Sequence, residues 1–186
     1  MNCLLEKEMS VIKLEYLPHY TYDDYCQWDG NWELIYGIPY AMSPSATIKH
    51  QNVSGKIHIE LDKKLKKCLT CDAVLAIDWK LNDETVLCPD NVVVCDLDNT
   101  KAFISQVPQI VFEVLSPSTK KKDRIQKYEI YQEQGIKYYI MIDPLNDRVE
   151  VYELNEGIYH LVLETIDSGF DFDLGRCQFN FDFSKI

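Results

Sequence analysis

Basic residues are scarce in this 186-residue chain, and long apolar runs are absent. Nineteen lysines and arginines stand against thirty aspartates and glutamates, which gives a net charge of −11. This excess of acidic residues argues against a protein that binds nucleic acid tightly through a broad basic surface. No apolar stretch reaches the ~20 residues of a membrane-spanning helix, and the N-terminus lacks the apolar segment of a signal peptide. The sequence therefore predicts a soluble cytoplasmic protein.

Cysteine is present, but in no regular pattern. The seven cysteines are odd in number and unevenly spaced, which argues against a disulfide framework. A zinc site can be drawn from Cys68, Cys71, Cys88 and Cys95. However, the first two end a lysine-rich helix that lacks the turn glycines of a zinc knuckle. We therefore expect buried free thiols.

The few basic residues gather in two short windows, which together hold eleven of the nineteen. We interpret the first window as the solvated face of a helix. The second lies close in sequence to an unusual buried carboxylate, Glu113, and is a candidate for function. The first window holds Lys49, Lys56, Lys63, Lys64, Lys66 and Lys67, and the second holds Lys120, Lys121, Lys122, Arg124 and Lys127.

The chain shows no internal repeat, low-complexity tract or long linker, which predicts a single domain over residues 1–186. We divide it into an N-terminal segment (1–30), a core (31–155) and an acidic C-terminal extension (156–186). The periodicities predict an α/β (α+β) fold in which helices flank one mixed sheet. The expected elements are a hairpin over 32–42, a helix over 47–69, strands over 73–81, 86–95 and 109–115, a helix over 122–134, a strand over 138–142, and a hairpin over 149–164.

Glu113 is the most informative residue, because it interrupts an apolar run typical of a buried strand. An ionised carboxylate there is costly unless it is paired or binds a cation. Asp90 begins another apolar strand twenty-three residues earlier. Because strands so connected can be neighbours in one sheet, the two carboxylates can converge on a Mg²⁺ ion. Such an ion polarises a phosphodiester and activates water.

Each of these residues also has a simpler interpretation. Lys127 is a candidate to stabilise charge on a phosphate, but its spacing favours a surface ion pair with Asp123, four residues earlier. Glu113 can form a buried ion pair, and Asp90 can be a turn residue after proline. These alternatives remain open at the level of sequence.

Two further polar residues, Glu33 and His50, can join this group. Glu33 lies at the start of a predicted strand, and His50 lies in the first turns of the long helix. Each taken alone is better explained as a surface or capping residue.

Several segments, taken in order, resemble the Uma family of putative restriction endonucleases, which belongs to the PD-(D/E)XK nuclease superfamily. The resemblance covers roughly residues 30 to 155. The segments that carry it are Glu33-Leu34-Ile35-Tyr36-Gly37, Met42-Ser43-Pro44, His50, Pro89-Asp90, Val111-Phe112-Glu113-Val114-Leu115-Ser116-Pro117-Ser118-Thr119, Asp123-x-x-x-Lys127-x-x-x-Tyr131, Gly135-Ile136 and Tyr138-Tyr139-Ile140-Met141-Ile142-Asp143-Pro144.

The resemblance implies a restriction-endonuclease-like core with an N-terminal β-hairpin, and phosphodiester hydrolysis that depends on Mg²⁺ or Mn²⁺, with DNA as the expected substrate. It makes Asp90 and Glu113 the metal-binding carboxylates and Glu33 an accessory acid. Leu115 occupies the lysine position of the usual E-x-K motif, so the resemblance assigns that role to Lys127 on the following helix.

A second hypothesis is a nuclease-fold module that no longer cleaves and instead binds nucleic acid or protein, because a fold does not guarantee a function. Many restriction-type nucleases cut two strands as dimers. By this analogy we expect nucleic acid and a second copy of the chain as partners. We expect no association with a membrane.

Overall fold

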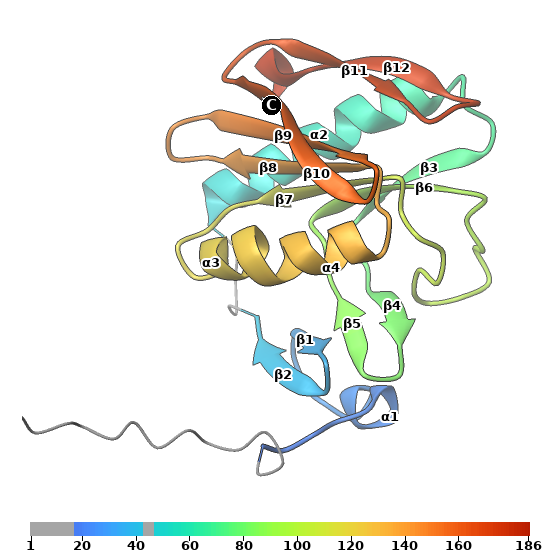
Figure 1. Ribbon diagram of the computed structural model, residues 1–186, viewed down its shortest axis with the longest axis vertical. Coiled ribbons are helices and arrows are strands. Elements are labelled where there is room, and N and C mark those ends of the chain that lie inside the picture. Colours follow the sequence, from blue (N-terminus) through green and yellow to red (C-terminus); the bar gives the residue numbers. More distant parts are fainter. Residues whose placement is uncertain (1–16, 43–46) are drawn as a thin grey trace, which may run out of the picture.

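The computed structural model describes residues 17–42 and 47–186 (Figure 1). Its centre is a six-stranded sheet with the strand order β10-β9-β8-β7-β6-β3. β7 and β8 are parallel and the other neighbours antiparallel, so the predicted mixed sheet and α+β class are confirmed. The strands are β3 (Cys71–Leu75), β6 (Asn91–Cys95), β7 (Ile110–Val114), β8 (Tyr138–Asp143), β9 (Arg148–Asn155) and β10 (Ile158–Thr165).

A smaller sheet of four strands, in the order β2-β1-β5-β4, lies at one end of the central sheet (Figure 1). It is built from β1 (Trp32–Ile35), β2 (Ile38–Ala41), β4 (Trp79–Asn82) and β5 (Thr85–Leu87). The predicted N-terminal hairpin is confirmed. Its two-residue turn, Tyr36-Gly37, has positive φ at both positions, as a type I′ turn requires.

The predicted strands 73–81 and 86–95 are wrong as continuous elements. Each is divided between the two sheets, β3 from β4 and β5 from β6. The second break falls at Cys88-Pro89-Asp90, where proline has no N–H to give to a sheet. This break places Asp90 just outside the central sheet.

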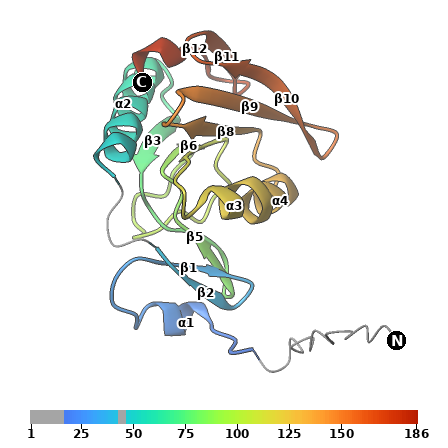
Figure 2. The same cartoon turned by 90° about the vertical axis from the view of Figure 1, so that its left-hand side faces the viewer.

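Helices cover both faces of the central sheet (Figure 2). On one face lies α2 (Ile48–Leu65), whose four-residue spacing buries Val53, Ile57, Leu61 and Leu65, as predicted. On the other lies a continuous helical segment of α3 (Lys120–Lys122), the π-helical turn η2 (Asp123–Lys127) and α4 (Tyr128–Glu133). The sequence predicted this second helix but not its π turn. A short helix, α1 (Tyr22–Tyr25), precedes the small sheet.

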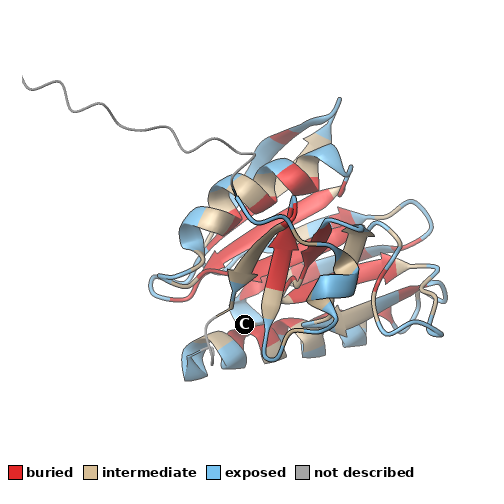
Figure 3. Ribbon diagram, turned by 90° about the horizontal axis from the view of Figure 1, so that it is seen from below, coloured by how far each residue is buried: buried red, intermediate tan, exposed pale blue. Residues whose placement is uncertain are grey.

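The side chains of β7 alternate between two hydrophobic cores, one on each face of the sheet. Phe112 belongs to the core under α2, whereas Val111 and Leu115 belong to the core under α4. By this alternation Glu113 points toward α4. The buried strands and exposed outer helix surfaces are visible in Figure 3.

The C-terminal segment is part of the folded body. It supplies β10 to the central sheet, then β11 (Gly169–Asp173), β12 (Gln178–Asp182) and η3 (Phe183–Lys185). Phe172 and Phe181 are buried, with ring centroids 6.2 and 5.4 Å from that of Phe112. Phenylalanines therefore face inward, while residues such as Asp171 and Asp173 remain exposed.

Four cysteines form two disulfides, so the expectation of free thiols is wrong for them. Cys71 and Cys95 are directly paired across β3 and β6 and are bonded. Cys68, after α2, is bonded to Cys177, before β12, across a sequence separation of 109. Among the described residues, Cys26 and Cys88 are the free cysteines. No three histidine, cysteine, aspartate or glutamate side chains of the described residues are grouped as a zinc site requires.

Some sequence features lie outside the described residues, namely Cys3 and the Ser43-Pro44 part of the family motif. Within residues 17–42 and 47–186, no helix combines the length and apolar character needed to cross a membrane.

Candidate active site

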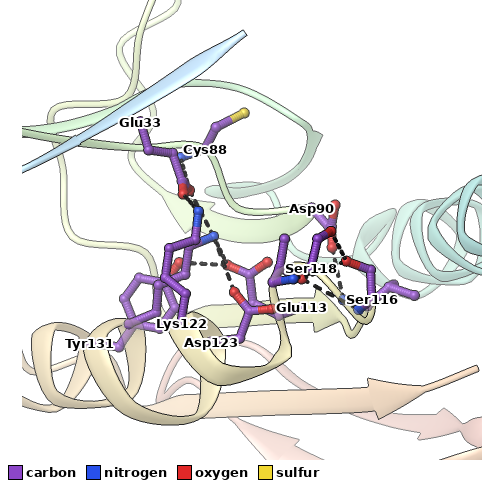
Figure 4. A network of polar contacts seen from close by, with 12 residues as sticks. Glu33, Cys88, Asp90, Glu113, Ser116, Ser118, Lys122, Asp123 and Tyr131 are labelled. Atoms are coloured by element: carbon purple, nitrogen blue, oxygen red, sulfur yellow. Dashed lines mark hydrogen bonds and ion pairs between the residues drawn. The ribbon is translucent and has the colours of Figure 1, made fainter. Parts of the chain in front are cut away.

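Glu113 is the centre of a buried polar cluster on the α4 side of the central sheet (Figure 4). Its side chain is almost fully buried. Its Oε1 accepts hydrogen bonds from Lys127 Nζ at 2.7 Å and from the Tyr131 hydroxyl at 2.7 Å. Burial raises the pKa of Glu113 to about 8, against the lowering effect of Lys127. Glu113 therefore has the cationic partner that its position in a strand demanded.

Asp90 lies on the neighbouring strand connection. Asn91 pairs with Phe112 in the last pair of the β6–β7 ladder, so Asp90 and Glu113 are the next residues along these two chain segments. The Asp90 carboxylate contacts α2, whereas the Glu113 carboxyl group contacts the helical segment on the other face. Oδ2 of Asp90 accepts a hydrogen bond from the Val114 N–H at 2.8 Å and lies 3.3 Å from Nε2 of His50. The hydrogen bond to Asp90 raises the pKa of His50. Asp90 thus has two fixed partners through one oxygen.

Lys127 is buried, so the surface ion pair that its spacing favoured is wrong. Besides Glu113, its Nζ lies 2.8 Å from Glu33 Oε1 and 3.8 Å from Asp123 Oδ1. Burial alone would lower the pKa of Lys127, but Glu113 and Glu33 raise it well above its usual value. Lys127 is therefore held as an ammonium group among three carboxyl groups.

Glu33 comes from β1 of the small sheet and is fully buried, so it is not a surface residue. Oε1 accepts a hydrogen bond from the Cys88 N–H at 3.1 Å as well as contacting Lys127, and Oε2 contacts Lys122. Burial would raise the pKa of Glu33, but Lys127 and Lys122 hold it below its usual value. This ionised carboxylate joins the small sheet to the helical segment.

Asp123 and Tyr131 belong to the cluster but were given no role in it by the sequence. Asp123 is 1% exposed, and neither of its carboxylate oxygens accepts a hydrogen bond from a described residue. Burial raises its pKa. The available signal was the spacing of Asp123, Lys127 and Tyr131, four residues apart on one helix. Asp123 is the first residue of the π-helical turn and Lys127 is its last. Such turns are rare and often occur at functional sites.

The second basic window is largely neutralised by acids. Lys120 contacts Asp143 at 2.8 Å, and Arg124 binds Glu150 through two hydrogen bonds of 2.8 and 2.9 Å. Lys122 and Lys127 contact the acids of the cluster. Lys121 is exposed and forms no ion pair with the part of the chain that the structure describes. The fold therefore leaves one lysine of this window available.

The donor set suits a hard divalent cation. No described residue forms a hydrogen bond or ion pair with Oε2 of Glu113 or Oδ1 of Asp90, and both oxygens of Asp123 lack hydrogen bonds within the described chain. Mg²⁺ commonly takes one or two carboxylates and completes its shell with water. Among the described residues, no three histidine, cysteine, aspartate or glutamate side chains are grouped so that they could hold a metal ion.

Comparison with known proteins places the chain in a family. The model of Uma2, described as putative restriction endonuclease, matches residues 20–168. The chain belongs to the Uma2 family. The resemblance read from the sequence motifs is thereby confirmed. The matched region includes all the residues of the buried cluster, from Glu33 on the small sheet to Tyr131 on α4.

Two individual proteins are similar to this Uma2 chain. An uncharacterized protein of Synechocystis sp. is 33% identical over 86 residues, which is 45% of each chain, so the match spans less than half of that relative. A crystal structure from Anabaena variabilis, described as a putative nuclease belonging to DUF820, superposes with a TM-score of 0.64 at 16% identity. That superposition covers 76% of this chain and 83% of the other. The shared fold confirms the predicted nuclease-like core, and family and fold together support a nuclease-like function.

Proposed function

We propose that this Uma2 protein is a metal-dependent endonuclease of the PD-(D/E)XK type that hydrolyses phosphodiester bonds in DNA. The observation that carries the proposal is the buried ammonium of Lys127, 2.7 Å from Glu113, with Asp90 one residue beyond the end of the neighbouring β6–β7 ladder. A buried lysine among several carboxylates is costly to maintain. Such an arrangement is typical of a site that handles a charged substrate.

Asp90 and Glu113 would hold the Mg²⁺ or Mn²⁺ ion through their unused oxygens, and Asp123 offers two more. When bound, the ion supplies positive charge to a phosphate and lowers the pKa of a coordinated water. A cation would also relieve the repulsion among these acids, which helps to raise the pKa of Glu113. These carboxylates therefore have a physical reason to bind a divalent ion.

Lys127 would stabilise the negative charge that develops on the phosphate. The position expected for this lysine holds Leu115, which is 3% exposed and packs in the core under α4. The positive charge instead arrives from the helix above the strand. Glu33 and Tyr131 would act on the reaction only indirectly, Glu33 by fixing Lys127 and Tyr131 by fixing Glu113.

The test is cleavage of supercoiled plasmid and of labelled single- and double-stranded DNA, with Mg²⁺, Mn²⁺ or EDTA. Wild type should cut DNA in either metal and not in EDTA. Glu113→Gln should reduce the rate roughly 100-fold or more, the scale of losing one preorganised electrostatic group. Lys56→Ala, which removes an exposed lysine on α2, is the matched control and should cut normally. Equal rates for wild type and Glu113→Gln would assign the cleavage to a contaminant and refute the proposed site.

A second candidate is a module that binds nucleic acid without cutting it. It is favoured by the close pairing of Lys127 with both Glu113 and Glu33, which leaves the ammonium neutralised. Binding of DNA with no cleavage in either metal would select this function. Sedimentation of the complex would also show whether two copies assemble on one duplex, as a double-strand cut by a dimer requires.

A further inference from the structure

A cavity of about 560 Å³ lies beside the acidic cluster, between β2 and the α3–η2 segment. Its volume is within the range of small-molecule sites, roughly 300–1,000 Å³. Pro39 and Tyr40 line one side, and Ile125 and Gln126 line the other. Lys121 also lines it and adds a positive charge that no described acid pairs. The cavity thus combines apolar and aromatic surface with a cationic rim.

The cavity shares a wall with the acidic cluster. Tyr40 is the direct partner of Glu33 across β1 and β2, so both side chains lie on the same face of the small sheet. Lys122 lines the cavity, contacts Glu33 and places its Nζ 5.7 Å from the centre of the Tyr40 ring. A ligand in the cavity would therefore lie next to the groups proposed to act on a phosphodiester.

Two side chains of the cavity have chemistry that the cluster does not use. Tyr40 is half-buried, and its hydroxyl accepts a 3.1 Å hydrogen bond from the Gln126 amide, which fixes the ring. Lys121 is exposed and has no ion pair with a described residue. An aromatic ring beside an available cation suits a nucleotide, because any base can stack on the ring while its phosphate meets the lysine.

We infer that this cavity is a nucleobase-binding subsite, which holds an unstacked base of the DNA strand adjacent to the phosphodiester being cut. The base stacks on Tyr40 and Ile125, and Lys121 binds the neighbouring phosphate. The inference rests on the proposed nuclease function and adds to it a preference for single-stranded or locally opened DNA. In such DNA a base enters a cavity without the cost of leaving a duplex stack.

The experiment measures binding separately from cleavage. A short single-stranded oligonucleotide containing 2-aminopurine is titrated with the protein in EDTA, and fluorescence gives both affinity and base stacking. Tyr40→Leu should weaken binding roughly 10-fold, within the usual range for losing one base–aromatic stack, and should abolish the fluorescence change. Tyr40→Phe keeps the ring and should retain both signals.

Three further variants make the test specific. Ile125→Glu alters a side chain that is 47% exposed, so it places a carboxylate in the cavity without disturbing the core, and it should weaken binding as Tyr40→Leu does. Lys121→Ala should lower the slope of log affinity against log salt by about 0.7, the value for one contact with a single-stranded phosphate. Lys56→Ala, an exposed lysine on α2, should change neither affinity nor slope.

The outcomes separate this inference from the proposed function. Stacking that depends on Tyr40 and Ile125 supports the subsite even if no metal restores cleavage. Normal cleavage with unchanged binding by Tyr40→Leu and Ile125→Glu overturns the subsite and leaves the nuclease intact. A salt slope that responds to Lys121 alone reveals a backbone contact and also overturns the base pocket. A wild type that binds no oligonucleotide overturns it as well.

Discussion

Replacing Lys127 with methionine should destabilise the protein far more than its position on a helix suggests. The change removes the ammonium that lies 2.7 Å from Glu113 and 2.8 Å from Glu33. It leaves Glu113 buried without a cationic partner and leaves Glu33 with Lys122 alone. Breaking a buried ion pair in this way typically costs about 3–5 kcal/mol. An exposed pair with Asp123 would be worth only ~0.3–0.5 kcal/mol.

The cost should depend on pH, with a sign set by Glu113. The folded-state pKa of Glu113, about 8, is above its unfolded value, so the stability it contributes is complete at low pH and is lost as pH rises through the folded pKa. Without Lys127 this pKa rises further, because the lysine was lowering it. The penalty of Lys127→Met should therefore be larger at pH 9 than at pH 6.

Urea denaturation at pH 6 and pH 9 measures both effects. Lys121→Met, an exposed neighbour on the same helical segment, is the matched control and should change stability little. Adding Glu113→Gln to Lys127→Met should recover part of the loss, since the amide can keep the Tyr131 hydrogen bond without a charge. A loss below about 1 kcal/mol at both pH values, the range of exposed pairs, would refute the buried network.

Two other measurements test the remaining structure. Mn²⁺ should raise the melting temperature more at pH 8 than at pH 6, because the ion competes with the proton on Glu113. Thermal shift assays at both pH values measure this, and a response that does not depend on pH would contradict the prediction. Replacing the Cys68–Cys177 bridge by serines should cost more than replacing Cys71–Cys95, about 5 against about 3.5 kcal/mol, because it closes the longer loop. Equal urea midpoints for the two serine variants would contradict that order.

Local patterns predicted the parts of the fold that depend on local physics. The four-residue spacing of Val53, Ile57 and Leu61 identified α2, and Gly37 identified the first hairpin. The division of residues 73–81 between two sheets was not predictable, because both halves have strand character and the choice of sheet depends on distant partners. The Cys68–Cys177 bridge was missed for the same reason, since its cysteines are 109 positions apart.

The sequence predicted which residues form the candidate site better than it predicted which of them contact one another. A carboxylate in a buried strand required a cation, and Glu113 indeed has one. The sequence favoured a surface pair for Lys127 because Asp123 gave it a sufficient local partner. It could not reveal that Glu33, ninety-four positions earlier, contacts the same ammonium. The roles assigned to Asp90, Glu113, Lys127 and Glu33 in catalysis stay predictions.

The π turn between α3 and α4 sets the phase between two halves of one helix. At its N-terminal side, Lys120 and Arg124 contact acids on β8 and β9. At its C-terminal side, Lys127 and Tyr131 contact Glu113 on β7. Deleting a single residue within the turn would rotate one half by about 100° relative to the other, the angle of one residue in a 3.6-residue helical repeat. Either the contacts with β8 and β9 or the contacts with Glu113 would then be lost together. This turn should therefore tolerate substitutions on its exposed face but no change in length.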